Sequence, residues 1–308
     1  MSYDVAILIV TYNSKEQINA CLQSVLEQRG SLNQQVVVVD NNSQDSTVAL
    51  VRSKFPSVKV VTPGQNLGFA KGVNLAASHA DAEYVLLLNP DTVVLNNAIE
   101  KVVRFARTNP GYALYGGRTL KPDRSLEPSS CWGSPTLYSV FLYAFGLTTL
   151  APRNRWLDPE SLGSWPRNTI REVGIITGCF LLVHRDAWQK LAGLDERYFM
   201  YGEDADFSMR ARAAGYRPVI FPEAEVVHEV GKSSSTPLHK ALLLYKGKAC
   251  YIRTHWTGLK RAIGLSLLTL GVGMRAAAGT IVRMRNQTWI GLWKQRAEWI
   301  KGYPTKTV

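Results

Sequence analysis

The first 120 residues alternate between short runs of β-branched residues and segments with helical spacing, and this alternation limits the fold more than any other feature. Short apolar runs are typical of strands buried on both faces, and segments with apolar residues three and four apart are typical of covering helices. We therefore expect an α/β domain whose mixed, mainly parallel sheet is flanked by helices. Its first strands are predicted at residues 4–10, 35–40, 58–62, 84–89 and 112–116.

The helices between these strands have recognisable start signals. Ser14 and Gln17 have the spacing of a capping box, which predicts a helix beginning at Ser14. A second helix is expected after Asp45, and a third after residues 66–68.

The pattern is interrupted in the middle of the chain. Residues 117–170 are rich in Pro, Gly, Ser, Arg and Trp, and their one apolar island, at 137–150, is too short to span a bilayer. Strands at 178–184 and 217–221 and a helix at 204–214 then restore the α/β pattern. No repeat or low-complexity tract is present in the sequence.

The net charge of +12 is concentrated in the last quarter of the chain. Residues 1–231 carry 22 Lys and Arg against 23 Asp and Glu, whereas residues 232–308 carry 14 basic residues and one acid, Glu298. Such an asymmetry indicates an anionic surface as the partner of the C-terminal part rather than a nucleic acid bound by the whole chain.

The basic C-terminal part, residues 236–308, is expected to be helical and rich in aromatic residues. Its segment 262–282 has the length of a membrane span but contains Arg275 and several Gly and Thr residues, so we favour an interfacial helix or hairpin. Trp residues interleave with Lys and Arg there, as suits a lipid headgroup layer. The alternative is that these are ordinary solvated helix faces.

The start of the chain and its cysteines bear on the compartment. The sequence opens with MSYDVAILIV, which lacks the basic region and cleavage site of a signal peptide, so we expect a cytoplasmic catalytic domain. The four cysteines have neither the spacing of a zinc site nor that of a disulfide framework. We expect them to be small buried apolar residues.

Two segments after early strands could bind a nucleotide. Asp40 ends a β-branched run, where its carboxylate could accept a hydrogen bond from N3–H of uracil or thymine. Alternatively, Asp40 only caps the turn. Gly68 and Gly72 surround a predicted helix start, where backbone N–H groups could approach a pyrophosphate, but packing explains such glycines equally well.

The segment YVLLLNPD at residues 84–91 is the most informative one. Its apolar run predicts a central strand that delivers Asn89 and Asp91 to its carboxyl end. A carboxylate there could hold Mg²⁺ or Mn²⁺, which would neutralise a leaving diphosphate. The alternative is that Asn-Pro-Asp is an ordinary turn.

Later residues supply candidates for acid–base chemistry and for further ligands. Glu203 and Asp204 lie where a helix should begin, and Asp204 is our first candidate for a general base, although acids are common in any first helical turn. His228 could complete a metal shell, and Lys232 and Ser233 could hold phosphate.

Taken in order, these segments resemble the inverting family 2 glycosyltransferases, and within them the rhamnosyltransferase-like branch. The resemblance spans about residues 3–235 and is carried by these segments: TYN at 11–13, VVDNNSQD around Asp40, NLGFAKGVN at 66–74, LLLNPD ending at Asp91, TGCFLLVHRDAW at 177–188, FMYGEDADF at 199–207, and His228 with GKSS. It implies a GT-A (Rossmann-like) fold.

The resemblance also implies roles for individual residues. Asp91 and His228 would bind the metal, Asp204 with Glu203 would carry catalysis, and Thr177 and Gly178 would lie near the acceptor. The donor would be bound by Thr11, Tyr12, Asn13, Asp40, Asn66, Gly68, Phe69, Lys71, Asn74 and Asn89. The family often has Asp-x-Asp where this chain has Asn89, so we expect metal to bind well only together with the nucleotide.

The expected organisation follows the same resemblance. Residues 1–235 would form the catalytic domain, with a nucleotide-sugar half at 1–120 and an acceptor-side half at 121–235. Residues 236–308 would form a membrane-associating extension, and the protein would lie peripherally on the cytoplasmic face of the inner (plasma) membrane.

The expected activity is transfer of a sugar, L-rhamnose from dTDP-L-rhamnose in the first instance, to a saccharide or polyprenyl-diphosphate-linked acceptor in cell-surface polysaccharide synthesis. A UDP-linked donor (galactose, galactofuranose or N-acetylglucosamine) is the alternative. Two rival classes are a nucleotidyltransferase and a non-catalytic membrane scaffold. A nucleotidyltransferase needs a triphosphate-binding loop soon after the first strand, and the segment TYNSKEQ does not supply one.

Overall fold

The computed structural model describes residues 1–28, 30–228, 236–281 and 287–304. The chain forms two compact units. Unit 1 consists of Met1–Trp132, Pro166–Asp195 and Asp204–Lys232, and unit 2 consists of Gly133–Trp165, Glu196–Glu203 and Ser233–Val308. Unit 2 therefore contains the whole of the expected extension together with two segments from earlier in the chain.

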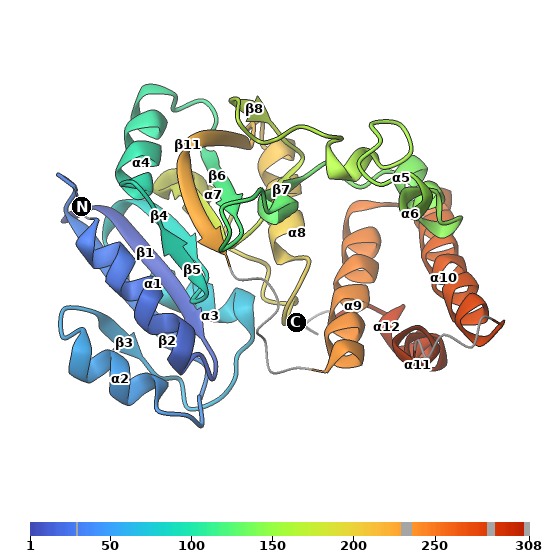
Figure 1. Cartoon of the computed structure of the whole chain (residues 1–308), viewed down its shortest axis with the longest axis horizontal. Helices are drawn as coiled ribbons and strands as arrows, with labels where there is room; N and C mark the ends of the chain where they lie inside the picture. The colour runs from blue at the N-terminus through green and yellow to red at the C-terminus, as the bar shows by residue number, and fades with distance from the viewer. Residues whose placement is uncertain (29, 229–235, 282–286, 305–308) are drawn as a thin grey trace. The chain divides into compact units, whose positions relative to one another are not determined.

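Unit 1 is organised around a sheet that has nine strands in the described part of the chain, in the order β3-β2-β1-β4-β10-β6-β11-β5 with β8 beside β11 (Figure 1). The strands are β1 (Tyr3–Thr11), β2 (Gln34–Asp40), β3 (Lys59–Val61), β4 (Ala82–Leu88), β5 (Thr92–Val94), β6 (Leu114–Leu120), β8 (Arg171–Glu172), β10 (Phe180–His184) and β11 (Val219–His228). Strands β3, β2, β1 and β4 are parallel, whereas β10 is antiparallel to β4 and β6. The expected mixed α/β sheet is confirmed.

Helices cover both faces of this sheet. They are α1 (Lys15–Glu27), α2 (Thr47–Lys54), α3 (Phe69–Ser78), α4 (Ala98–Thr108), α7 (Arg185–Lys190) and α8 (Glu203–Ala213), whose first residue is assigned to unit 2. Alternate residues of β1, including Ile7 and Ile9, enter one core with residues of α1, α2 and α4. On the other face α3 lies so close that a Cβ on Gly72 would come within 2.9 Å of the Val10 side chain. Gly72 therefore serves packing.

The start of α1 differs from its prediction. Ser14 is the residue before the helix, but its side chain makes no capping hydrogen bond. Its hydroxyl instead donates to the Tyr12 carbonyl at 3.2 Å, and its N–H donates to Thr47 Oγ1. The predicted capping box is thus wrong, because Ser14 is used to join α1 to the neighbouring loop.

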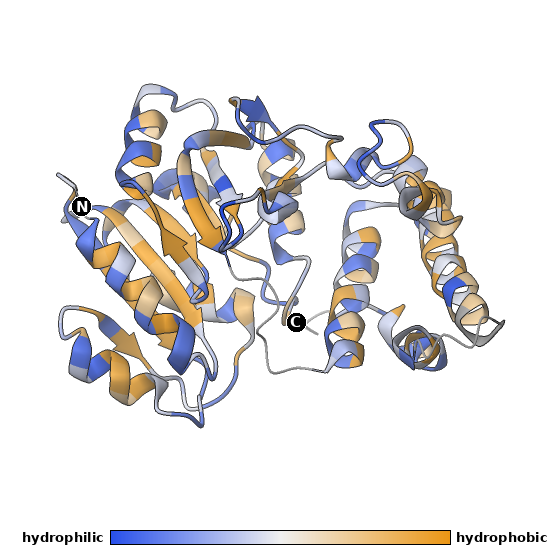
Figure 2. Ribbon diagram, viewed as in Figure 1, coloured by the Kyte–Doolittle hydropathy of each residue, from blue (hydrophilic) through white to orange (hydrophobic). Residues whose placement is uncertain are grey.

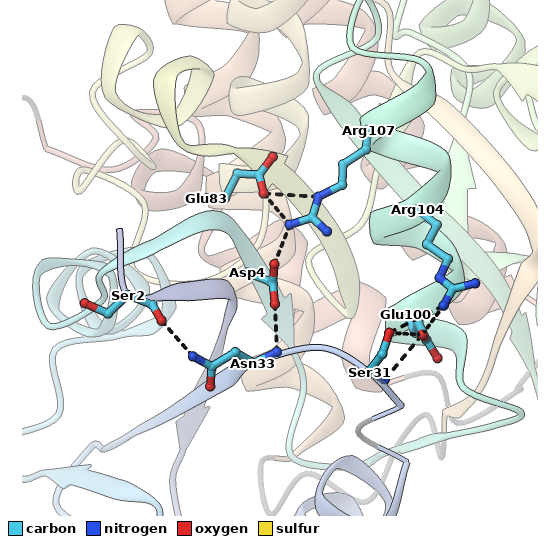
Figure 3. A network of polar contacts seen from close by, with 8 residues as sticks. All are labelled: Ser2, Asp4, Ser31, Asn33, Glu83, Glu100, Arg104 and Arg107. Carbon is cyan, nitrogen blue, oxygen red and sulfur yellow. Dashed lines mark hydrogen bonds and ion pairs between the residues drawn. The ribbon is translucent and has the colours of Figure 1, made fainter.

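A network of polar contacts holds the amino edge of the sheet (Figure 3). Arg107 of α4 donates to Asp4 at the start of β1 and to Glu83 in β4, and the Asn33 N–H donates to Asp4 at 2.7 Å. The Arg107 hydrogen bond is the main cause that lowers the pKa of Asp4 below its usual range. These contacts join α4 and the segment before β2 to the amino edge of the sheet, which is opposite the carboxyl edge of the predicted site.

Unit 2 is helical in its described part. The helices are α5 (Leu137–Ala144), α6 (Leu147–Leu150), α9 (Pro237–His255), α10 (Gly258–Ile281), α11 (Gln287–Lys294) and α12 (Arg296–Trp299), and they confirm the expected helices after Pro237. In the described chain, no helix has both the length and the apolar character needed to cross a membrane. A small two-stranded sheet of β7 (Cys131–Trp132) and β9 (Ile175–Ile176) belongs to unit 1.

The segment Glu196–Glu203 belongs to unit 2, where it packs against the C-terminal part of the chain. A Cβ on Gly247 of α9 would come within 2.1 Å of the Tyr201 carbonyl oxygen, so only glycine fits there. Near the end of the described chain, the Tyr303 hydroxyl donates to the Met200 carbonyl.

All four cysteines are free and buried, as expected.

Candidate active site

The predicted donor-binding residues follow the carboxyl ends of three neighbouring strands. β1 ends at Thr11, β2 at Asp40 and β4 at Leu88, and Thr11 pairs in register with Asp40. Ligands of open α/β sheets bind outside this edge. The fold therefore gathers segments that are far apart in the sequence.

Asp40 is buried and caps the turn that follows β2. The Ser43 hydroxyl donates to Oδ1 at 2.6 Å and the Ser43 N–H donates to Oδ2 at 2.9 Å. Ser43 also accepts a hydrogen bond from the Asn13 N–H at 2.8 Å, and Asn13 Oδ1 accepts from the Gln44 N–H. The turn is thereby joined to the loop after β1, which presents Tyr12 45% exposed beside it.

The loop before α3 is held by Asn41, a residue that the sequence analysis did not single out. Its buried amide donates to the Gly68 carbonyl at 3.0 Å and accepts from the Leu67 N–H at 3.3 Å. Asn66 Oδ1 accepts from the Gly68 N–H at 2.9 Å. Gly68 has φ of 79°, a conformation that favours glycine. The helix start at Phe69 is thus fixed beside the end of β2.

The side-chain amide of Asn74, in contrast, is hydrogen-bonded to the backbone of the protein itself. Its amide nitrogen donates to the Leu194 carbonyl at 2.8 Å, and its oxygen accepts from the Leu194 N–H at 2.9 Å. Its contribution to donor binding would be to shape the site. Lys71, three residues earlier on α3, is half-buried.

The Asn-Pro-Asp segment forms a turn that the pairing of β5 with β11 orients. The Thr92 N–H donates to the Asn89 carbonyl, and Thr92 then lies opposite His228 in the antiparallel register. This register places His228 Nε2 3.2 Å from Asp91 Oδ1 and 3.4 Å from Asn89 Nδ2. The three predicted residues therefore converge, although 139 positions separate Asn89 from His228.

The convergent atoms fit a divalent metal that has few protein ligands. A carboxylate oxygen and an imidazole nitrogen are suitable ligands for Mn²⁺, whereas the Asn89 atom beside His228 is an amide nitrogen, which can donate hydrogen bonds but cannot bind a metal. Among the described residues, however, no group of three or more His, Cys, Asp or Glu side chains is placed to hold a metal. Most of a metal shell would have to come from the ligand.

Asp204 lies in the first turn of α8. The Ala205 N–H donates to its Oδ1 at 2.8 Å, and the Gly178 N–H also donates to its carboxylate. Burial nevertheless raises the pKa of Asp204 above its usual range, because the charged form loses solvation that the two hydrogen bonds only partly replace. A raised pKa suits a carboxylate that must accept a proton.

The buried thiol of Cys179 is affected by the charges of both Asp91 and Asp204. Burial is the main cause that raises the pKa of the Cys179 thiol to about 11, and the charges of Asp91 and Asp204 both add to the increase. The two carboxylates are therefore close to the same thiol. Nothing in the segment TGCFLLV distinguishes Cys179 from an ordinary buried apolar residue, so sequence reasoning missed it.

Of the remaining predicted residues, Gly178 and Thr177 belong to unit 1 and Glu203 belongs to unit 2. Gly178 lies against the Phe69 ring, which a Cβ would approach to 3.1 Å, and Thr177 Oγ1 donates to the Ser129 carbonyl at 2.9 Å. Glu203 is buried and belongs to unit 2, where its charge adds to the burial that raises the pKa of Tyr303. Lys232 and Ser233 lie outside the described residues.

The position of α8 depends on a buried ion pair. Arg210 Nε donates to Asp206 Oδ2 at 2.7 Å, and the other two guanidinium nitrogens donate to the carbonyls of Leu191 and Gly193. The Asp206 side chain is fully buried. This contact ties the helix that carries Asp204 to the loop after α7.

We expect Asp206→Ala to lower the free energy of unfolding by about 2 kcal/mol, because the partly exposed Arg210 guanidinium would lose its hydrogen bond to the fully buried carboxylate. The control is Asp186→Ala, at a 77% exposed side chain in the first turn of α7, which should change it by less than about 1 kcal/mol. Denaturant titration measures both. Equal destabilisation by the two variants would contradict the role of the pair.

The sequence matches two family models. The model described as "Glycosyl transferase family 2" matches residues 6–161, and that described as "Glycosyl transferase family group 2" matches residues 164–306. A relative from Mycobacterium tuberculosis, "N-acetylglucosaminyl-diphospho-decaprenol L-rhamnosyltransferase", is 32% identical over 218 residues, which cover 65% of this chain and 67% of that protein. The chain belongs to glycosyltransferase family 2.

A further relative and two solved structures are also similar to this chain. "Rhamnosyltransferase WbbL" of Escherichia coli is 24% identical over 73% of this chain and 83% of its own length. The mannosyltransferase PcManGT from Pyrobaculum calidifontis, solved with GDP-Man and Mn²⁺, superposes with a TM-score of 0.57 at 17% identity, covering 98% of this chain and 84% of its own. S. aureus TarS 1–349 gives a TM-score of 0.55 at 17% identity, over 98% and 81%. These structures confirm the expected GT-A fold.

The family 2 assignment makes this protein a glycosyltransferase with rhamnosyltransferase-like relatives. It excludes the nucleotidyltransferase alternative, and the relatives named as rhamnosyltransferases count against a non-catalytic scaffold.

Proposed function

We propose that this family 2 enzyme transfers a sugar, with L-rhamnose from dTDP-L-rhamnose as the first candidate, to a hydroxyl of a lipid-linked saccharide, with inversion at the anomeric carbon. The observation that carries the proposal is the convergence of Asp91 and His228, 3.2 Å apart, near Cys179, whose thiol pKa the charges of both Asp91 and Asp204 raise. The similarity to the N-acetylglucosaminyl-diphospho-decaprenol L-rhamnosyltransferase of Mycobacterium tuberculosis supports both the sugar and the acceptor class.

In this proposal the donor lies across the carboxyl edge. Asp40 accepts a hydrogen bond from N3–H of the base while Ser43 holds its carboxylate, and the start of α3 faces the diphosphate. Thymine and uracil present the same N3–H, so a UDP-sugar donor is the alternative that Asp40 does not exclude.

Asp204 removes the proton from the acceptor hydroxyl as that oxygen attacks the anomeric carbon. Its raised pKa makes it a stronger base than an ordinary aspartate, and the Gly178 and Ala205 N–H groups fix its orientation. Asp91 and His228 would hold Mg²⁺ or Mn²⁺, with Asn89 beside them. When bound, such a metal supplies positive charge to the departing diphosphate.

A donor screen tests the proposal. The full chain would be incubated with a short polyprenyl-diphosphate-linked saccharide and, separately, with dTDP-rhamnose, UDP-galactofuranose and UDP-N-acetylglucosamine. Mass spectrometry should detect a deoxyhexose added to the acceptor from dTDP-rhamnose only. Transfer only from a UDP-sugar would overturn the proposed donor, and transfer from none would overturn the proposed reaction.

We expect Mn²⁺ to bind measurably only in the presence of the nucleoside diphosphate. Asp91 and His228 supply two protein ligands, and Asn89 is a neutral amide in place of a carboxylate, so diphosphate oxygens are needed to complete the shell. Isothermal titration of Mn²⁺ with and without dTDP measures this. Asn89→Asp should strengthen binding to the free protein, and tight binding by the unmodified free protein would refute the expectation.

A further inference from the structure

Unit 2 exposes far more large apolar side chains than unit 1. Twelve of the fifteen exposed large hydrophobic residues in the described chain lie in unit 2, although it is the smaller unit. Scattered exposed apolar residues need no explanation, but a concentration of them indicates an interaction surface. Figure 2 shows apolar residues along most of α10.

Four of these residues form a row on α10. Leu259 is 76% exposed, and Ile263, Leu270 and Met274 are each about 40% exposed. At about 100° per residue they fall within roughly 60° of the helix circumference. The opposite side of α10 is buried, as Leu268 and Val272 show. α10 therefore has an apolar row, interrupted by Ser266, that no described part of the chain covers.

A second row lies on α5, which packs against α10 within unit 2. Tyr138, Phe141 and Phe145 are each 43% exposed or more, and the rings of Phe141 and Phe145 are 4.7 Å apart. Their spacing of three and four residues puts them on one side of α5.

The two helices are held together by a close contact. A Cβ on Gly271 would come within 3.0 Å of the Ala144 backbone. Arg275 donates to the Tyr143 carbonyl at 2.8 Å and stacks on the Tyr143 ring at 4.1 Å. Around the helix Gly271 and Arg275 lie about 60° and 100° beyond the edge of the apolar row, so the contact with α5 leaves this row uncovered while it holds the two helices, and with them the two rows, together. We call them together the α5–α10 face.

The basic residues of the C-terminal part favour a negatively charged partner for this face. α10 contains no Asp or Glu, and residues 232–308 carry 14 basic residues and one acid. Exposed Trp156 and Trp293 stack with Arg155 and Arg296, at 4.7 and 4.4 Å. Such pairs place an apolar ring at the headgroup level of a bilayer and a cation among the phosphates.

We infer that the α5–α10 face docks on an anionic lipid bilayer. The inference names the surface that would bring the enzyme to a lipid-linked acceptor, and it rests on the proposed function only for that purpose. It extends the membrane contact beyond the basic C-terminal part, because α5 lies a hundred residues earlier. A second copy of the chain is the competing occupant.

Vesicle co-sedimentation of the full chain tests this inference. The protein should bind phosphatidylcholine vesicles that contain phosphatidylglycerol, should bind pure phosphatidylcholine more weakly, and should dissociate as salt is raised. The double variant I263Q/L270Q should lower the partition coefficient about tenfold or more, because two aliphatic side chains no longer enter the bilayer. The matched control is Ile170→Gln, at a 52% exposed apolar residue in unit 1, which should bind like the unmodified chain.

Two results would overturn the inference. One is equal vesicle binding by I263Q/L270Q and the unmodified chain. The other is a dimer, seen by analytical ultracentrifugation, that the double variant converts to monomer while neither protein binds vesicles. Transfer to a short-chain acceptor soluble in water is measured in parallel. If that transfer persists while vesicle binding fails, only the docking inference is lost; if transfer is absent while binding stands, only the proposed function is lost.

Discussion

Asp91→Ala is expected to abolish sugar transfer and to leave the fold unchanged. The side chain is a quarter exposed in the turn between β4 and β5, where it contacts His228, so truncation removes little packing. What is lost is the carboxylate ligand that would hold the metal against the leaving diphosphate. We expect kcat to fall by roughly a thousandfold or more.

The measurement is transfer rate under saturating donor, with thermal unfolding to monitor the fold. Asp123→Ala is a matched control, because Asp123 also caps an exposed turn, by accepting hydrogen bonds from Ser125. The control should retain full activity. An Asp91→Ala enzyme with a rate near that of the unmodified protein would remove Asp91 from the metal site.

Asp204→Asn should retain donor binding and lose turnover by roughly a thousandfold. The amide has the same shape, and its oxygen can still accept from the Ala205 N–H, but it cannot take a proton. Donor affinity measured by calorimetry separates this result from misfolding. Near-normal turnover would exclude Asp204 as the base, and Asp186→Asn should behave like the unmodified enzyme.

The pH dependence gives an independent check on Asp204. The base must be ionised, so kcat should rise as pH rises through its pKa, and burial places that pKa above the usual range of an aspartate. The acid limb of the profile should therefore lie at higher pH than an exposed carboxylate would give. An acid limb at the usual aspartate value would indicate a different base.

The first half of the sheet could be predicted from sequence because each of its strands is a continuous apolar run. β1, β2 and β4 match the predictions to within two residues at each end. Local pattern carries this information, since a strand buried on both faces needs apolar residues throughout.

Pairing between distant segments could not be predicted in the same way. β5 has only three residues, and its partnership with β11 sets the distance from Asp91 to His228. The sequence of β5 or of β11, taken by itself, does not indicate the register in which the two strands pair. For the same reason Ser43 and Asn41 were missed, because their importance lies in which atoms they meet after folding.

Residues on both sides of the predicted boundary at residue 235 contact one another within unit 2. The segment Glu196–Glu203 immediately precedes Asp204 in the chain, yet it packs with α9 and with Tyr303. An enzyme shortened after residue 235 would lose both supports for Tyr201 and Met200. We therefore expect a chain trimmed at the C-terminus to lose the packing of the peptide that leads into Asp204, the proposed base, and to bind its donor but turn over slowly.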